Sequence, residues 1–429
     1  MGSVDQATTG GLLQRYDEAL ARDPIAALGL IRQWMREDWR SLFAELREHR
    51  PIFVTPAFTV VTRFADVLEV LSHEEVFSVR AFGPRLDAAL GAPFMLGRDA
   101  TPMNWREKGL MRVMLEPGDA GRVRELTGRL ADDLLDVAEP HGRIDAIDEL
   151  FRPVALGVCA GYFGIPGPDQ QTLSRWTQAI VADGFANYLA DPQIQAASVE
   201  AGTELVAYLR GRLAALRARD ELPDDVFGRL VGSRLPDGVG MTDDRILVNM
   251  AGLALGFVES APGAMAGAVE QLLLRPHVLA QALEVAGDTE RFEQYVWEAL
   301  RFNPFFKLIP RICEQDHVLA AGTPRAALIP AGTFVLTAPA SAMFDADVVP
   351  EPEEFRPNRP RHHRLFFGSG HHACLGMHVA GPVIGEAVRR LLLRPGVRLL
   401  PPPEGEIEYR LGIFPGRFAL ELGTGEREG

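Results

Sequence analysis

One short stretch of the chain combines a single cysteine with neighbouring histidines and closely spaced glycines. Residues 367–376 read FGSGHHACLG and place Cys374 in a glycine-rich loop that leads into an apolar helical stretch. Gly368 and Gly370 permit a tight turn and the close approach of a flat ligand. At a helix start, free backbone N–H groups and the positive end of the helix dipole favour a thiolate over a thiol. A thiolate donates electrons strongly to a heme iron and favours cleavage of the O–O bond of bound oxygen.

This loop resembles the heme-binding loop of the cytochrome P450 family, which follows the pattern Phe-Gly-x-Gly-x-His-x-Cys-x-Gly-x-x-x-Ala. The chain fills every fixed position, with Phe367, Gly368, Gly370, His372, Cys374, Gly376 and Ala380. The resemblance implies heme b, with the iron held by Cys374 and with Phe367, Gly368 and Gly376 in the loop that binds the cofactor. It also implies the cytochrome P450 fold, which is triangular and mainly α, with a small β region and a buried heme.

The same stretch allows a different interpretation as a zinc site. Four neighbouring side chains are potential zinc ligands: His371, His372, Cys374 and His378. A structural zinc site usually supplies paired thiolates or spaced Cys and His pairs. The chain has only three cysteines, and Cys159 and Cys313 have no such spacing. A non-catalytic heme or zinc binder is therefore the alternative from another class, and the absence of Cys-x-x-Cys-His excludes covalent c-type heme.

The composition is that of an ordinary globular protein. Apolar residues make up 47% of the 429 residues and charged residues 24%. With 44 Lys and Arg against 58 Asp and Glu, the net charge of −14 argues against nucleic acid as a partner. Few cysteines indicate a reducing compartment. No signal peptide is recognisable, and the longest uncharged run, 326–344, contains prolines and a glycine. We expect a cytoplasmic, monomeric protein with no membrane span.

Helical periodicity dominates the rest of the chain. Thr242 and the two acidic residues after it predict the start of a long helix that ends before Pro276. Strand signals are confined to four short runs, at 52–54, 59–62, 308–312 and 333–337. No repeat, low-complexity segment or linker divides the chain. The sequence therefore predicts one domain, 1–429, mainly α with a small sheet.

A Glu-x-x-Arg pair, Glu298 and Arg301, lies on a predicted helix, where an i, i+3 spacing lets the two side chains meet. A lone pair of this kind is most often a solvated ion pair. Together with the arginines that follow along the chain, this pair resembles the Glu-x-x-Arg motif of the family and the arginine downstream of that motif. The resemblance assigns Glu298, Arg301 and Arg359 to a buried structural network that supports the heme loop, with Arg356 as the competing third member.

Heme propionates need cationic or hydrogen-bonding partners, and the resemblance suggests His372 and Arg311. The family usually adds a His-x-x-x-Arg from an earlier helix, and here the chain departs from the pattern. The ungapped alignment puts Asn104 at the histidine and Lys108 at the arginine. Trp105 offers an indole N–H instead, and Lys108 keeps the charge without the bidentate fork. Each of these is equally consistent with a surface residue.

The long central helix departs from the family pattern as well. Residues 256–260 read GFVES where the family has Ala/Gly-Gly-x-Asp/Glu-Thr, and its acid and alcohol manage protons for bound dioxygen. By resemblance Glu259 and Ser260 are the catalytic pair. Pro262 lacks an N–H and clashes with the carbonyl of Val258, so it predicts a kink. The uncharged residues before Glu259 indicate that it is buried; the alternative is an ordinary charged residue at a helix edge.

The substrate pocket is expected to be apolar and enclosed. The segments that line it by family position contain six candidate residues, each of which is otherwise plain core: Phe82, Phe94, Met95, Phe257, Leu308 and Phe414.

The resemblance implies a monooxygenase that hydroxylates an apolar small molecule with dioxygen. No flavin or nicotinamide fingerprint is present, so the two electrons are expected from a ferredoxin or a similar redoxin with its reductase. The basic segment 359–364 is a candidate surface for an acidic redoxin. The unusual central helix keeps open a peroxide-using or isomerising enzyme that needs no redoxin.

Overall fold

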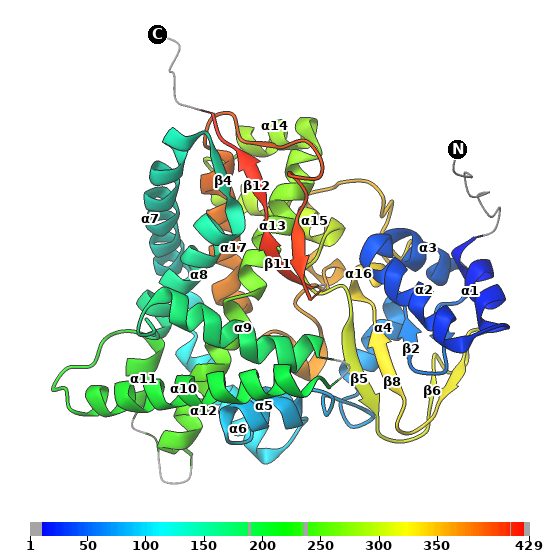
Figure 1. Ribbon diagram of the computed structural model, residues 1–429, viewed down its shortest axis with the longest axis horizontal. Helices are drawn as coiled ribbons and strands as arrows, with labels where there is room; N and C mark the ends of the chain where they lie inside the picture. The colour runs from blue at the N-terminus through cyan, green and yellow to red at the C-terminus, as the bar shows by residue number, and fades with distance from the viewer. Residues whose placement is uncertain (1–10, 188–189, 234, 236–238, 412, 424–429) are drawn as a thin grey trace. The chain divides into compact units, whose positions relative to one another are not determined.

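The structure is a computed structural model that describes residues 11–187, 190–233, 235, 239–411 and 413–423 (Figure 1). These residues fall into two compact units, each built from separate stretches of the chain. The first comprises Met1–Ser78 and Lys307–Glu353, and the second Val79–Phe306 and Glu354–Gly429. The single domain expected from the sequence stays a prediction.

The first unit contains a mixed five-stranded sheet with the order β1-β2-β8-β5-β3. Its strands are β1 (Ile52–Val54), β2 (Thr59–Val61), β3 (Phe77–Ser78), β5 (Ile309–Cys313) and β8 (Phe334–Thr337). A separate hairpin joins β6 (His317–Leu319) to β7 (Ala327–Ile329). The helices of this unit are α1 (Leu12–Leu20), α2 (Pro24–Glu37), α3 (Trp39–His49), α4 (Phe64–Ser72) and α16 (Pro339–Ala342). All four predicted strand runs are confirmed, and they belong to this one sheet.

The second unit is mainly helical. Its helices are α5 (Gly83–Leu90), α6 (Pro102–Met114), α7 (Ala120–Ala138), α8 (Arg152–Val158), α9 (Gln170–Ala186), α10 (Pro192–Arg217), α11 (Val226–Gly232), α12 (Asp243–Phe257), α13 (Ser260–Leu273), α14 (Pro276–Glu284), α15 (Thr289–Phe302) and α17 (Met377–Leu392). A three-stranded sheet has the order β4-β12-β9, formed by β4 (Arg143–Asp145), β12 (Ala419–Glu421) and β9 (Arg398–Leu399). A hairpin pairs β10 (Glu408–Arg410) with β11 (Phe414–Arg417). The predicted fold class, mainly α with a small β region, is confirmed.

The central helix is interrupted where its sequence predicts. Thr242 caps α12 by accepting a hydrogen bond from the Arg245 N–H. α12 ends at Phe257, and α13 begins only at Ser260, so Val258 and Glu259 lie between two helices. Pro262 stands in the first turn of α13, where a missing N–H costs least. The predicted kink is thus a break that turns Glu259 out of the regular helix.

The core of the second unit surrounds α13, which packs against α15 and α17 (Figure 1). The run Asp243–Leu273, which covers α12 and α13, is by length and composition long and apolar enough to cross a membrane. However, 83% of its most apolar window is buried inside the protein. Core helices of globular proteins pass the same test, so this is weak evidence for a membrane span.

Candidate functional site

The cysteine loop has the tight geometry that its glycines predict. Gly368 and Gly370 have φ angles of 69° and 68°, a left-handed conformation that favours glycine. The Cys374 N–H donates to the Phe367 carbonyl at 2.9 Å, which closes the loop on itself. α17 begins at Met377, three residues after the cysteine. The loop therefore presents the cysteine just ahead of the first turn of α17.

Cys374 is exposed, although protein atoms surround it closely. Burial raises the pKa of its thiol, and a hydrogen bond from Gly376 and the charge of Lys108 oppose this only in part. The effect of the helix start on the thiol therefore stays a prediction. A metal ion bound by Cys374 would supply the opposing charge, because a coordinating thiol is deprotonated outright.

Two glycines show that the residues present fit a flat cofactor. Gly256 is exposed, whereas Leu255 and Phe257 on either side of it are buried. A Cβ added at Gly256 would meet no atom within 4 Å, and the same is true at Gly376. Both backbone segments thus leave clearance for a flat ligand, and Gly376 lies two residues from the accessible thiol of Cys374. The site fits a heme held by Cys374.

Helix α6 holds the cysteine loop through His371. The Oδ1 atom of Asn104 is 2.7 Å from Nε2 of His371, and Lys108 Nζ donates to the His371 carbonyl. Asn104 and Lys108 are buried, and Asn104 also donates to the carbonyls of Met95 and Arg98. Asn104 and Lys108 therefore lie on the face of α6 that holds the loop, and neither is a surface residue. Their role toward a propionate stays a prediction.

The sequence did not reveal that His371 joins the loop to α6, because this residue fills a variable position of the motif. The signal that was available is the spacing of Asn104 and Lys108, which puts both on one face of a helix. Trp105 is 57% exposed, and its ring lies 4.4 Å from the ring of His371, in an edge-on contact. Its indole stands at the surface, beside the loop.

The other histidine of the loop has an acidic partner that the sequence did not reveal. Nε2 of His372 lies 3.1 Å from Oδ1 of Asp99, and the same oxygen accepts the Val79 N–H at 3.0 Å. Arg311, the other propionate candidate, belongs to β5 in the first unit, where it is buried and donates to the Pro310 carbonyl. The propionate role of both residues stays a prediction.

Glu298 and Arg301 form a buried pair on α15. Arg301 donates two hydrogen bonds to the Glu298 carboxylate, at 3.0 and 2.8 Å. Arg359 Nε donates to the same carboxylate at 3.0 Å, whereas Arg356 contributes its backbone N–H at 2.9 Å. Both guanidiniums also bind the Glu354 carbonyl. The third side chain of the network is thus Arg359, and its supporting role toward the heme loop stays a prediction.

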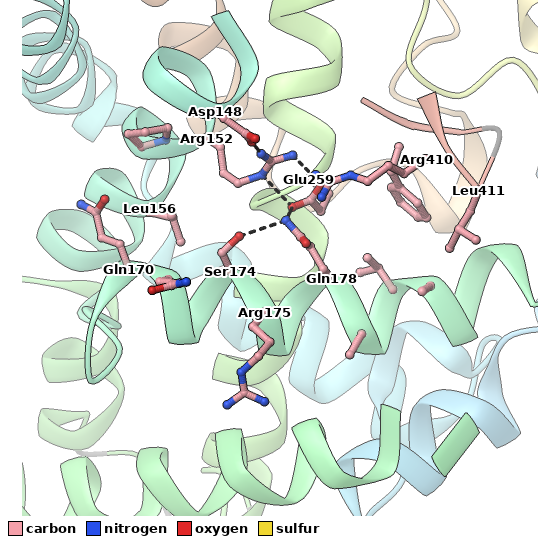
Figure 2. A pocket seen from close by; sticks show the side chains of 16 residues that line it. Asp148, Arg152, Leu156, Gln170, Ser174, Arg175, Gln178, Glu259, Arg410 and Leu411 are labelled. Atoms are coloured by element: carbon pink, nitrogen blue, oxygen red, sulfur yellow. Dashed lines mark hydrogen bonds and ion pairs between the residues drawn. The ribbon is translucent and has the colours of Figure 1, made fainter. Parts of the chain in front are cut away.

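Glu259 is buried at 2% exposure and is fully occupied by partners (Figure 2). Arg152 on α8 contacts both carboxylate oxygens, at 3.1 and 3.3 Å, and Gln178 on α9 donates to one of them at 3.2 Å. Arg152 also pairs with Asp148 and donates to the Pro415 carbonyl. The break in the central helix therefore directs this acid toward α8 and α9.

Ser260 and Phe257 flank that acid in different settings. The Ser260 hydroxyl donates to the Gly256 carbonyl, one turn back. The Phe257 ring is buried, 5.3 Å from the ring of Phe163. Phe257 thus occupies a core position, and its assignment to the substrate pocket stays a prediction.

Aromatic rings lie over the central helix on both sides of Gly256. A Cβ at Gly252 would collide with the Phe94 ring, and one at Gly263 with the Phe305 ring. Further ring contacts run from Phe82 through Phe185, Phe306 and Phe305 to Phe414. These five rings form what we call the aromatic wall of the second unit, and Phe82 and Phe414 are its two ends. Phe94 packs on the central helix at Gly252.

The two remaining pocket candidates are Met95 and Leu308. Met95 is buried, and its carbonyl accepts a hydrogen bond from Asn104. Leu308 belongs to the first unit, where it packs against the core of α1 to α3. Both assignments stay predictions.

The zinc interpretation lacks a ligand set. Across the described part of the chain, no three His, Cys, Asp or Glu side chains gather in a geometry suited to a metal ion. In the loop itself, His371 and His372 turn to Asn104 and Asp99. The cysteine thus stands without the further protein ligands that a structural zinc ion needs.

An accessible thiol on a glycine loop, in a mainly helical protein, defines the heme-thiolate class, and comparison with known proteins agrees. A family model described as Cytochrome P450 matches residues 291–405. Nocardicin C N-oxygenase of Nocardia uniformis subsp. tsuyamanensis is 30% identical over 365 residues, which cover 82% of this chain and 86% of that protein. Cytochrome P450 monooxygenase PikC of Streptomyces venezuelae is 29% identical over 427 residues, covering 94% and 95%. The solved structure of CalO2 superposes with a TM-score of 0.79 at 23% identity, over 91% of this chain and 97% of that one.

The chain belongs to the cytochrome P450 family. It is an oxidoreductase of the monooxygenase type, and its cofactor is heme b with Cys374 as the axial thiolate. The heme, when bound, supplies the dioxygen chemistry, and the protein supplies the axial ligand.

Proposed function

We propose that this monooxygenase hydroxylates an apolar small molecule, with dioxygen and with electrons from a separate redoxin. The observation that carries the proposal is the pair of aromatic rings, Phe94 and Phe305, that flank the exposed Gly256 on the central helix. Positions 252 and 256 are one turn apart on α12, so the Phe94 ring and the open glycine share one side of that helix. Such a wall accepts an apolar molecule next to the cofactor.

A titration of the ferric holoenzyme with a panel of apolar ligands tests this proposal. Displacement of the iron-bound water changes the spin state, so a substrate that enters the site shifts the Soret band. A shift confined to one chemical class supports the proposal and identifies the substrate class. No shift with any apolar ligand contradicts it.

Proton delivery is the role that we propose for Glu259 and Ser260. The Ser260 hydroxyl sits at the break, bound to the carbonyl of the exposed Gly256. Glu259 is one residue away and is buried between two donors, Arg152 and Gln178. The acid and the hydroxyl are thus neighbours at the break in the central helix, and we assign them the transfer of a proton toward the pocket.

Ser260→Ala distinguishes a dioxygen-using enzyme from the peroxide-using or isomerising alternative. If Ser260 conducts protons, coupling of electron consumption to product falls by roughly tenfold or more, within the usual range for loss of a proton-transfer group. The comparison is product formed per electron consumed against product formed with added peroxide. A peroxide user barely changes in either assay. Ser233→Ala, a hydroxyl deletion at the end of α11, serves as the control.

The surface proposed to meet the redoxin must be restricted to one of its two tested arginines, Arg361 and not Arg364. Arg361 is exposed, but the Arg364 guanidinium is turned inward, where it binds Gln294 and the carbonyls of Pro357 and Arg359. Charge reversal at Arg364 would therefore disturb the fold. We retain Arg361 as the cation that an acidic redoxin meets.

Arg361→Glu is expected to slow reduction by the redoxin about threefold to tenfold at low salt, because a reversed rim charge lowers the association rate. The effect fades as ionic strength rises. Stopped-flow reduction at two salt concentrations measures it. Arg219→Glu, an equal charge change at an exposed position after α10, is the control. Equal rates for Arg361→Glu and wild type would rule out this surface.

We also propose that the protein works in the cytoplasm as a monomer. Its three cysteines are all free, as in a reducing compartment.

A further inference from the structure

A cavity of about 1150 Å³ adjoins Glu259 within the second unit (Figure 2). Its walls come from the π-helical turn before α8, from α8 and α9, and from the β10–β11 hairpin. The apolar part of the wall is formed by Pro153, Leu156, Ala179, Val181, Ala182, Leu411 and Phe414. The volume suffices for a small organic molecule, and the apolar area suits one with a hydrocarbon body.

Most charged side chains around this cavity are paired. Arg152 serves two carboxylates, Glu259 and Asp148. Arg175 pairs with Glu204 at 2.9 Å. Arg410 differs, because among the described residues its guanidinium makes no hydrogen bond or ion pair.

Hydrogen bonds tie the hairpin that carries Arg410 to the rest of the second unit. Its neighbour Tyr409 is hydrogen-bonded to Asn303, whose amide donates to Glu270 on α13. The next strand is tied down by the hydrogen bond from Arg152 to the Pro415 carbonyl. In Figure 2, Arg410 extends from the hairpin toward the Arg152–Glu259 pair. Arg410 itself is exposed, and its guanidinium stands at the cavity wall without a partner among the described residues.

Arg410 is the cation of this cavity wall that remains available to a carboxylate. Burial, and then the charge of Arg152, lowers the pKa of Arg410, whereas Glu259 and Asp145 oppose this. Arg152 and Arg410 together balance Glu259 and Asp148, so the group is neutral. A carboxylate brought to Arg410 gains a charge-assisted hydrogen bond without separating Glu259 from its own partner.

One residue connects this cavity with the aromatic wall. Phe414 lines the cavity, and its ring lies 6.3 Å from that of Phe305, which packs on α13 at Gly263. A ligand with its polar end at Arg410 can therefore extend along Phe414 toward Phe305.

We propose that the cavity binds the carboxylate end of an amphipathic substrate, and that Arg410 determines this specificity. The inference rests on the proposed function, because it specifies which apolar molecules enter the site. The hydrocarbon part lies along Phe414 and Phe305, and the carboxylate lies at the cavity wall. Esters and alcohols of the same length lack the charge and bind less well.

The test compares straight-chain carboxylic acids of eight to sixteen carbons, each with the alcohol of equal length. Calorimetry on the holoenzyme gives the affinities, and the ferric Soret band reports entry beside the iron. In wild type we expect the best acid to bind about tenfold or more tightly than its alcohol, the usual effect of a hydrogen bond to a charged group. Arg410→Gln should remove this preference and leave alcohol binding unchanged.

Arg417→Gln is the matched control, since Arg417 is exposed on the same hairpin, where it pairs with Glu408, and lies outside the cavity wall. It should keep the preference for acids. The inference is overturned if no acid binds, if Arg410→Gln keeps the preference, or if the acid binds through Arg410 without moving the Soret band. Failure of the proposed function is separate, because alcohols and other apolar ligands would then shift no band either.

Discussion

Cys374→Ser is expected to abolish the red-shifted absorption band of the ferrous–CO complex. That band requires a thiolate opposite the CO, and an imidazole or hydroxyl ligand moves it far to the blue. Cys374 is the exposed cysteine, whereas Cys159 and Cys313 are buried. The absorption spectrum of the reduced, CO-treated protein measures the change, and monooxygenase turnover should disappear with the band.

Cys159→Ser is the matched control. Cys159 lies in the core of the second unit, where burial raises the pKa of its thiol well above the usual range. This variant should keep the red-shifted band even if its stability falls. A thiolate-type band that persists in Cys374→Ser would show that another residue ligates the iron.

Glu298→Gln is expected to cost about 3–5 kcal/mol of stability, the usual effect of removing one partner from a buried ion pair. The carboxylate holds Arg301 and Arg359, which are both buried, and accepts the Arg356 N–H as well. Two guanidiniums would lose their anion together. Typical proteins are stable by only about 5–15 kcal/mol, so we expect a large fall in the urea midpoint and poor heme retention.

Glu290→Gln is the control, since Glu290 is exposed in the first turn of the same helix. An exposed substitution of this kind usually changes stability by about 0.5 kcal/mol or less. Urea unfolding followed by circular dichroism compares the two variants, and heme content is read from the Soret absorbance. If Glu298→Gln unfolds like Glu290→Gln, the network does not support the fold.

The hydrogen-bond partners of Glu259 connect its proposed role in proton delivery with the adjoining cavity. Its carboxylate is held by Arg152 and Gln178, and both of these side chains line the cavity where Arg410 stands. A substrate carboxylate bound at Arg410 would lie close to the proposed proton donor. Substrate binding and proton delivery would then depend on the same group of charges.

The sequence alone determined the features that depend on local chemistry. The motif around Cys374 specified the cofactor, because spacing within a short loop is visible in the sequence. Pro262 predicted the break in the central helix, since a missing N–H acts on its own turn. The four strand runs were found for the same reason. The desolvation of Cys374 could not be predicted in this way, because it depends on segments distant in sequence.

Only the tertiary structure decided which side chains meet across the chain. Arg152 meets Glu259 from 107 residues away, and His372 meets Asp99 from 273. No local pattern marks such pairs, because many arginines and aspartates would satisfy the same charge. The unpaired state of Arg410 depends likewise on the packing of a hairpin against two helices. Long-range packing sets these distances, and polar interactions are strong only within a few ångströms.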